Sequence, residues 1–164
     1  GVDVTPLSDI ASVAAASWRD DGTVHIEVID HKGGTGWVPA RMDELKKAWS
    51  PEAMVYTLAG QAGRVVGGSP ALQRQMWGLT GREYDRACGA FYDAIASGKI
   101  RHLGDPILDE AVQACRRSKG MSDLWHWSRA DTGADISPLV AASLAYYGLV
   151  EKTAKKKEQK WLVL

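Results

Sequence analysis

The sequence has no excess of charge of either sign and little cysteine. Its 164 residues include 20 basic and 20 acidic side chains, so no net charge draws the chain to nucleic acid or to a membrane surface. Any basic surface must therefore be local. The two cysteines, Cys88 and Cys115, lie in helix-like segments and form neither a disulfide framework nor a metal-ligand cluster. Such sparse cysteine usage suits a reducing compartment.

The sequence also has no membrane-spanning run and no targeting leader. The charge-free apolar stretch from Ile136 to Tyr147 is far shorter than a bilayer requires, and no charged-then-apolar segment precedes Asp3. We therefore expect a soluble intracellular protein with no membrane partner. The length corresponds to about one ordinary domain. Because the chain opens within an apparent strand, we expect that domain to belong to a longer polypeptide.

A phosphate-binding loop is absent as well. The glycine-rich segment 31–37 lacks the Gly-Lys-Ser/Thr ending that such a loop needs, and Val38-Pro39 follows it directly. We interpret this segment as an ordinary loop between two elements of secondary structure.

The first 30 residues predict three neighbouring strands. Residues 2–4 are apolar apart from Asp3, and the segments 11–18 and 23–30 flank a turn at 19–22. The segment 23–30 alternates apolar and polar residues with a period of two, which is typical of a half-buried strand. We therefore expect a hairpin that lies beside the first strand.

Helical and strand signals alternate through the rest of the chain. After a helix at 40–49, whose Met42, Leu45 and Trp49 fall at helical spacing, the apolar run 53–59 predicts a strand parallel to the first and beside it. Capping residues, turn residues and apolar stripes predict the later elements. These are a short helix at 61–66, a strand at 76–79, a helix at 81–97 capped by Thr80, a basic connector at 99–105, a helix from Pro106 ending in Arg116, Arg117 and Lys119, a strand at 125–127 and a buried helix from Ile136. This order predicts an α/β fold with a mixed central sheet and helices on both faces.

Two aspartates at opposite ends of the sequence carry the main chemical signal. Asp3 interrupts an otherwise apolar strand, and Asp135 immediately precedes the last helix. A helix N-cap explains Asp135 by itself, but in this fold the two carboxylates can converge, and they then repel each other unless cations lie between them. Divalent ions bridged by a phosphate oxygen satisfy such a pair and support phosphodiester hydrolysis. Asp131 is explained equally well as an auxiliary ligand or as a turn residue.

Four parts of the chain carry a family resemblance. They are Gly1-Val2-Asp3-Val4, the stretch from Asp30 to Trp37, the stretch from Ala87 to Asp93 with Ile100-Arg101-His102, and Asp135-Ile136-Ser137-Pro138-Leu139-Val140-Ala141-Ala142. Together they resemble the nuclease domain of the large terminase subunit of tailed phages, a ribonuclease H-like domain. The resemblance implies a ribonuclease H-like domain at 1–152, and we expect the lysine-rich residues 153–164 to form a tail. It also implies a metal-dependent endonuclease that cuts concatemeric viral double-stranded DNA during genome packaging.

The resemblance assigns roles to particular residues. It implies that Asp3 and Asp135 are the first and last metal ligands for Mg²⁺ or Mn²⁺, with two ions bound. Where the family places an acidic residue near the end of the strand at 53–59, this sequence has Thr57, which is a neutral and weaker ligand for a hard cation. Thr57 therefore predicts a lost or loosely held ion, with slow cutting, a need for high metal concentration, a preference for manganese, or no activity.

The resemblance also implies partners. These are double-stranded DNA, an N-terminal ATPase domain of the same polypeptide, the terminase small subunit and the portal, at the procapsid in the host cytoplasm. Contacts to DNA phosphates are expected from basic residues, and an ordinary surface charge is the alternative explanation for each one. The candidates are Lys32, Arg101, His102 and Arg129, with Arg64 and Arg74 in a wider set.

Two other functions remain open from the sequence. One is a DNA-binding module of the packaging motor with a weakened active site, which Thr57 suggests. The other is a different ribonuclease H-like nuclease of the resolvase or integrase type.

Overall fold

A four-stranded mixed sheet lies at the centre of the fold. The computed structural model describes residues 1–128 and 133–161, with the side chains of residues up to 156. The sheet has the order β1-β2-β3-β6, in which β1, β2 and β3 pair antiparallel and β6 joins β3 in parallel. Its strands are β1 (Val2–Val4), β2 (Ile10–Trp18), β3 (Val24–Gly33) and β6 (Ile100–Arg101). The predicted hairpin beside the first strand is confirmed.

Two smaller ladders complete the set of strands in the described residues. β4 (Val55–Thr57) pairs in parallel with β5 (Trp77–Leu79), and β7 (Arg116–Lys119) pairs antiparallel with β8 (Trp125–Ser128). The strand at β4 was predicted beside β1, and the two are in contact, but no ladder joins them. The residues on either side of β4 form hydrogen bonds with β5 instead of β1. The Met54 carbonyl accepts from the Trp77 N–H, and the Leu58 N–H donates to the Leu79 carbonyl.

Three further differences from the sequence prediction concern residues between elements. Residues 31–33, predicted as part of a loop, extend β3, and the predicted connector contains β6. A two-residue strand leaves no alternation for a sequence to display, which explains why β6 is missed. Arg116, Arg117 and Lys119 lie in β7 and not at a helix end, because Cys115 adopts an extended conformation and ends the helix before them.

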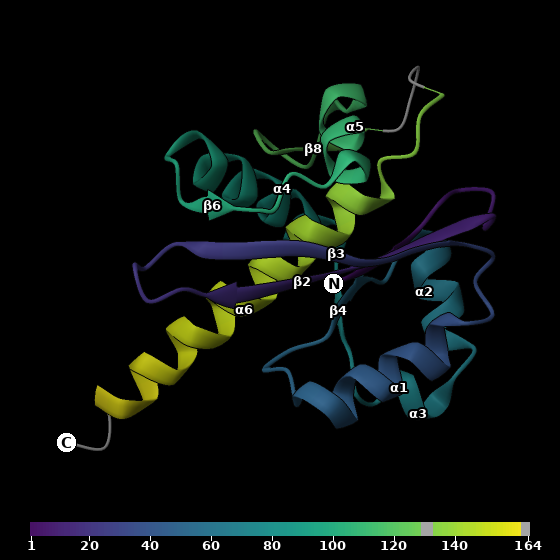
Figure 1. Ribbon diagram of the computed structural model, residues 1–164, viewed down its shortest axis with the longest axis horizontal. Coiled ribbons are helices and arrows are strands. Elements are labelled where there is room, and N and C mark those ends of the chain that lie inside the picture. The colour runs from purple at the N-terminus through teal and green to yellow at the C-terminus, as the bar shows by residue number, and fades with distance from the viewer. Residues whose placement is uncertain (129–132, 162–164) are drawn as a thin grey trace.

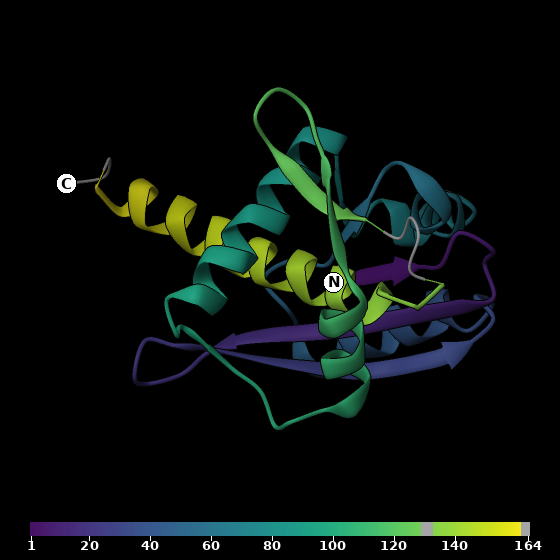
Figure 2. The same cartoon turned by 90° about the horizontal axis from the view of Figure 1, so that it is seen from above.

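Helices cover both faces of the central sheet (Figure 1). They are α1 (Val38–Trp49), α2 (Gly60–Gly67), α3 (Pro70–Gln73), α4 (Gly81–Ala96), α5 (Pro106–Ala114) and α6 (Ser137–Trp161). In Figure 1, α4 and α5 lie on one side of β2 and β3, and α1 to α3 lie on the other. Figure 2 shows α6 running past α4 to the C-terminus, and α6 also contacts β1, β2 and β3. The predicted mixed sheet with helices on both faces is confirmed.

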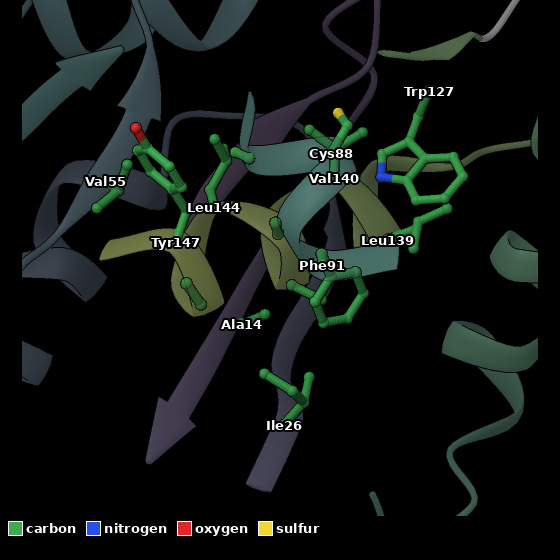
Figure 3. Packing of buried hydrophobic residues seen from close by; sticks show 14 of the residues in the cluster. Ala14, Ile26, Val55, Cys88, Phe91, Trp127, Leu139, Val140, Leu144 and Tyr147 are labelled. Carbon is green, nitrogen blue, oxygen red and sulfur yellow. The ribbon is translucent and has the colours of Figure 1, made fainter. Parts of the chain in front are cut away.

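One hydrophobic core lies between the sheet and α4, α5 and α6. It joins Ala14 and Ile26 of the sheet to Phe91 of α4 and to Leu139 and Leu144 of α6, as Figure 3 shows. These side chains are at most 2% exposed. The uncharged first half of α6 is therefore buried, as the sequence predicts, because it faces both the sheet and α4.

A second core fills the opposite face of the sheet. Val2 and Val13 pack there with Met42 of α1 and Val66 of α2. Because alternate residues of a strand point to opposite faces, β1 and β2 contribute to both sides of the sheet. The polar residues between these apolar ones, Asp3 and Ser12, consequently point toward α6.

Some predicted helical contacts and ends differ in the structure. Trp49 was expected on the inward face of its helix but is 78% exposed, and Ile95 of α4 and Val112 of α5 are 43% and 44% exposed. Each lies in the last turn of its helix. α6 continues as a helix through 153–161, the segment expected to be a tail. No helix in the described ranges is both long and apolar enough to cross a bilayer.

Candidate functional site

A row of polar side chains crosses the sheet on the face that α6 covers. In the strand register, Asp3 of β1 is opposite Ser12 of β2, and Ser12 is opposite His31 of β3. Directly opposed residues point to the same face of a sheet. Asp3 and Ser12 are 3% and 0% exposed, whereas the His31 side chain is 23% exposed. The row therefore begins in the interior and reaches the surface at His31.

A β-bulge in β3 places His31 in this row. The register shifts between Val13 and Ala14 of β2, so that Ile29 is an extra residue with no partner on the opposite strand. Before the bulge, Val28 faces the α6 side with Ala14; after it, His31 faces that side. If the strand alternated regularly through Ile29, His31 would face the opposite side, since it follows Val28 by three residues; the bulge reverses the alternation and returns it to the α6 side.

Hydrogen bonds connect the row to the start of α6. The Ser12 Oγ lies 2.9 Å from the His31 Nδ1 and 2.7 Å from the Ser137 Oγ. Ser12 and Ser137 are both fully buried, and their mutual hydrogen bond gives each hydroxyl a partner in the interior. At the exposed end of the row, the His31 Nε2 lies 3.9 Å from the Asp135 Oδ2. Residues 3 and 135 are thus brought to one face of the sheet, around Ser12.

Asp135 uses one carboxylate oxygen to cap α6. Its Oδ1 accepts a hydrogen bond from the Ser137 N–H at 2.7 Å, as expected for a carboxylate at a helix N-terminus. Its Oδ2 is buried and has no hydrogen-bond partner in the part of the chain that the structure describes. Leaving a buried carboxylate oxygen without a donor is costly unless a cation fills the gap. The capping role explains only half of this side chain.

Asp3 and Thr57 line one pocket of about 200 Å³, together with Gln61 at the start of α2. The position that the resemblance gives to a second acidic ligand is therefore next to Asp3. The Thr57 hydroxyl donates a hydrogen bond to the Ala59 carbonyl at 3.1 Å. At the first turn of α2, Arg64 donates to Gln61 at 2.8 Å. A basic side chain is thus held near this pocket.

Asp135 and Asp3 offer charged oxygen atoms to a divalent cation, whereas Thr57 does not. The unbonded Asp135 Oδ2 and the buried Asp3 carboxylate are the oxygen ligands that Mg²⁺ and Mn²⁺ prefer. Thr57 offers only a neutral hydroxyl. Residues 1–128 and 133–156 contain no group of three His, Cys, Asp or Glu side chains arranged to hold a metal. Asp131, the predicted auxiliary ligand, and Arg129, a predicted DNA contact, lie outside the described residues.

Lys32, another predicted DNA contact, is engaged by other side chains. Its Nζ pairs with Asp30 and lies 5.1 Å from the centre of the Trp37 ring. Arg41 of α1 binds the same carboxylate, with 2.6 Å between its Nε and the Asp30 Oδ2. Burial alone would raise the pKa of Asp30, but the hydrogen bonds and charges of Lys32 and Arg41 outweigh it, so this pKa lies below its usual value. Much of the charge of Lys32 is therefore balanced locally.

Arg101 and His102 lie at the other end of the sheet. Arg101 is opposite His25 in the register of β3 and β6, six residues before His31. At roughly 3.3 Å per residue this separates it from His31 by about 20 Å. His102 faces Asp109 of α5, with 4.0 Å between Nδ1 and Oδ1. The structure does not bring these two residues to Asp3 and Asp135.

Sequence reasoning missed the residues that connect the two aspartates. Ser12, His31 and Ser137 were not predicted as site residues. His31 stands in the glycine-rich segment that was interpreted as a loop, and the alternation of β3 assigns it to the wrong face unless the bulge is known. No local signal in the sequence could have identified it, because its face depends on the extra residue Ile29.

The chain resembles one solved structure in its fold. It superposes on the crystal structure of the HK97 bacteriophage large terminase with a TM-score of 0.69, covering 91% of this chain at 13% identity. The chain has the fold of part of a phage large terminase. It spans 38% of the length of that terminase. No protein-family model and no curated protein matches the sequence. The predicted terminase-like α/β fold is confirmed. At 13% identity the similarity supports the fold alone.

Proposed function

We propose that this chain is a metal-dependent endonuclease that cuts double-stranded DNA by phosphodiester hydrolysis during viral genome packaging. The observation that carries the proposal is the buried, unbonded Oδ2 of Asp135, which shares one face of a terminase-like fold with the buried Asp3. A carboxylate oxygen that accepts no hydrogen bond can coordinate a cation.

Asp3 and Asp135 are the proposed ligands for Mg²⁺ or Mn²⁺, with a second ion held weakly beside Thr57. The ions would supply an activated water and neutralise the charge on the leaving oxygen. Asp135 is oriented by the Ser137 N–H, which bonds its Oδ1 and turns its Oδ2 away. Thr57 contributes no charge, so the proposed site carries less negative charge than two ions require.

The partners follow from the fold likeness and are part of the proposal. Concatemeric double-stranded viral DNA is the substrate, and an ATPase domain of the same polypeptide, a terminase small subunit and the portal act with this chain. The site of action would be the procapsid in the host cytoplasm. Arg64, held by Gln61 at the edge of the pocket that contains Asp3 and Thr57, is a better placed phosphate contact than Arg101 or His102.

Nicking of supercoiled plasmid tests this function. We expect metal-dependent cutting by the chain and a loss of at least about a hundredfold in Asp3→Asn and Asp135→Asn, because each removes a charged ligand. In Asp135→Asn the side-chain oxygen still accepts the Ser137 N–H, so the fold is retained. Asp105→Asn is the matched control, since Asp105 caps α5 through the same bond, from the Ile107 N–H at 2.9 Å. Undiminished cutting by Asp135→Asn would refute the proposal.

Thr57 favours a second candidate, a DNA-binding module of the packaging motor with a weakened active site. Its hydroxyl is bonded to the Ala59 carbonyl and is uncharged. In that case the chain binds duplex DNA without cutting it, and Thr57→Asp restores cutting by returning a charged ligand to the pocket. Efficient cutting by the unaltered chain at ordinary magnesium concentration would exclude this candidate.

A further inference from the structure

Two side-chain atoms at the exposed end of the polar row face each other without a hydrogen bond. The His31 Nε2 and the Asp135 Oδ2 are 3.9 Å apart, which is too long for a hydrogen bond. Among the described residues, neither atom has a hydrogen-bond donor or acceptor elsewhere, although each side chain is largely buried. Both are therefore available to a common third group.

The other nitrogen of His31 has a partner that favours a ligating imidazole. The His31 Nδ1 lies 2.9 Å from the Ser12 Oγ, and this hydroxyl is 2.7 Å from the Ser137 Oγ. When Nδ1–H donates to Ser12, the Ser12 hydroxyl can donate onward to Ser137. This arrangement leaves the lone pair of Nε2 directed at Asp135. Metal-bound histidines commonly use their second nitrogen in this way, because the hydrogen bond fixes both tautomer and ring orientation.

The separation of the two atoms is close to that of two ligands of one ion. Bonds from a divalent ion to imidazole nitrogen and to carboxylate oxygen are roughly 2.1 Å long, so two ligands of one ion lie at most about 4.2 Å apart. Ligands in adjacent octahedral positions lie about 3.0 Å apart, so the observed 3.9 Å has to shorten by about 0.9 Å when an ion binds. Any shift of Asp135 toward the ion would leave its Oδ1 free to keep the bond from Ser137.

We propose that His31 is a metal ligand that acts together with Asp135. This inference rests on the proposed function, to which it adds a residue and a metal preference. The neutral imidazole adds a ligand beside Asp135 and does not replace the charge that is missing at Thr57. Imidazole is a better ligand for transition-metal ions than for Mg²⁺, so His31 should favour Mn²⁺ over Mg²⁺ at this site. The remaining coordination positions are open to water and to phosphate oxygens.

Pulsed electron paramagnetic resonance of bound Mn²⁺ tests this directly, because a directly bound imidazole gives a ¹⁴N modulation that oxygen ligands do not. We expect the modulation in the unaltered chain and its loss in His31→Gln. We also expect His31→Gln to weaken Mn²⁺ binding in calorimetry by about tenfold or more, with a smaller change for Mg²⁺. Ser12→Ala should keep the ¹⁴N modulation but weaken Mn²⁺ binding, because the ring loses its fixed orientation.

His25→Gln is the matched control for this experiment. His25 lies on the same strand, is 23% exposed like His31, and faces Glu27 at 3.8 Å. The same substitution there should leave the ¹⁴N modulation and the Mn²⁺ affinity unchanged. Effects of losing any half-buried histidine from β3 would appear in both variants.

The outcomes separate this inference from the proposed function. Bound Mn²⁺ without ¹⁴N modulation in the unaltered chain overturns the role of His31 and leaves the nuclease proposal standing. Modulation that persists in His31→Gln also overturns it. Absence of Mn²⁺ binding at millimolar concentration overturns both proposals. The spectrum of the unaltered chain decides the matter even if a variant fails to fold.

Discussion

Replacement of two helical glycines by alanine should have opposite effects on stability. Gly63 lies in α2, where that helix passes the end of β4; a Cβ added there would come within 2.0 Å of the Leu58 carbonyl oxygen and 2.8 Å of its carbon. Gly89 lies in α4, and a Cβ there would meet nothing within 4 Å. Both positions are helical, so they have the same intrinsic preference for alanine. Only the surroundings differ.

The magnitudes follow from the two sites. Gly89→Ala gains helix propensity worth about 1 kcal/mol, which raises the Tm by about 2–4 °C in a chain of this size. Gly63→Ala gains the same but must move a backbone carbonyl, so its overpacking cost lies at the upper end of about 1–3 kcal/mol. We expect a net loss of about 2 kcal/mol and a Tm lowered by roughly 4–8 °C.

Thermal unfolding followed by circular dichroism measures both variants under the same conditions. The double variant should behave as the sum of the two, because the helices do not share partners at these positions. If Gly63→Ala stabilised the chain as much as Gly89→Ala, the close approach of α2 to β4 would be refuted. The position of Thr57 beside Asp3 would then lose its support, since Thr57 lies at the end of β4.

The remaining predictions concern a thiol and a carboxylate. Burial raises the pKa of Cys88 to about 12, so at pH 8 a thiol reagent should label Cys115 first and Cys88 only on unfolding; rapid labelling of native Cys115→Ser would contradict this. The folded-state pKa of Asp30 is lowered, so its carboxylate stabilises the fold above its unfolded pKa, and this contribution is lost as the pH falls through the folded pKa. Asp30→Asn should therefore lower the Tm at pH 7, with the difference narrowing below about pH 5; a pH-independent difference would show that the charge is not involved.

The order of elements was largely available from the sequence, because alternation, helical spacing and capping are local signals. Thr80 illustrates this: it caps α4 by accepting from the Glu83 N–H, while Glu83 accepts from the Thr80 N–H. What could not be predicted depends on pairing between distant segments. The ladder of β4 with β5 and the short β6 are of this kind, since neither leaves a local pattern.

The candidate site was predictable only at its two ends. Asp3 and Asp135 stand out as charges at the boundaries of apolar segments, and chemistry links them once the fold is known. The sequence does not identify Ser12 and His31 as site residues, because a serine in a strand of small residues and a histidine near glycines are common without any functional role. Their proposed role depends on the strand register, and the register depends on a bulge that cannot be predicted from the sequence.

The bulge at Ile29 also limits how this protein can change during evolution. It sends Asp30 toward Arg41 of α1 and the next residue, His31, toward Asp135 at α6. Deleting Ile29 would leave Val28, Asp30 and His31 in regular alternation, so Asp30 and His31 would keep their present faces. A strand of the same length that paired without the bulge would instead exchange the two faces, which would break the ion pair between Asp30 and Arg41 and remove His31 from the candidate site. A homologue can therefore lose the extra residue, but it cannot keep that residue and pair it regularly.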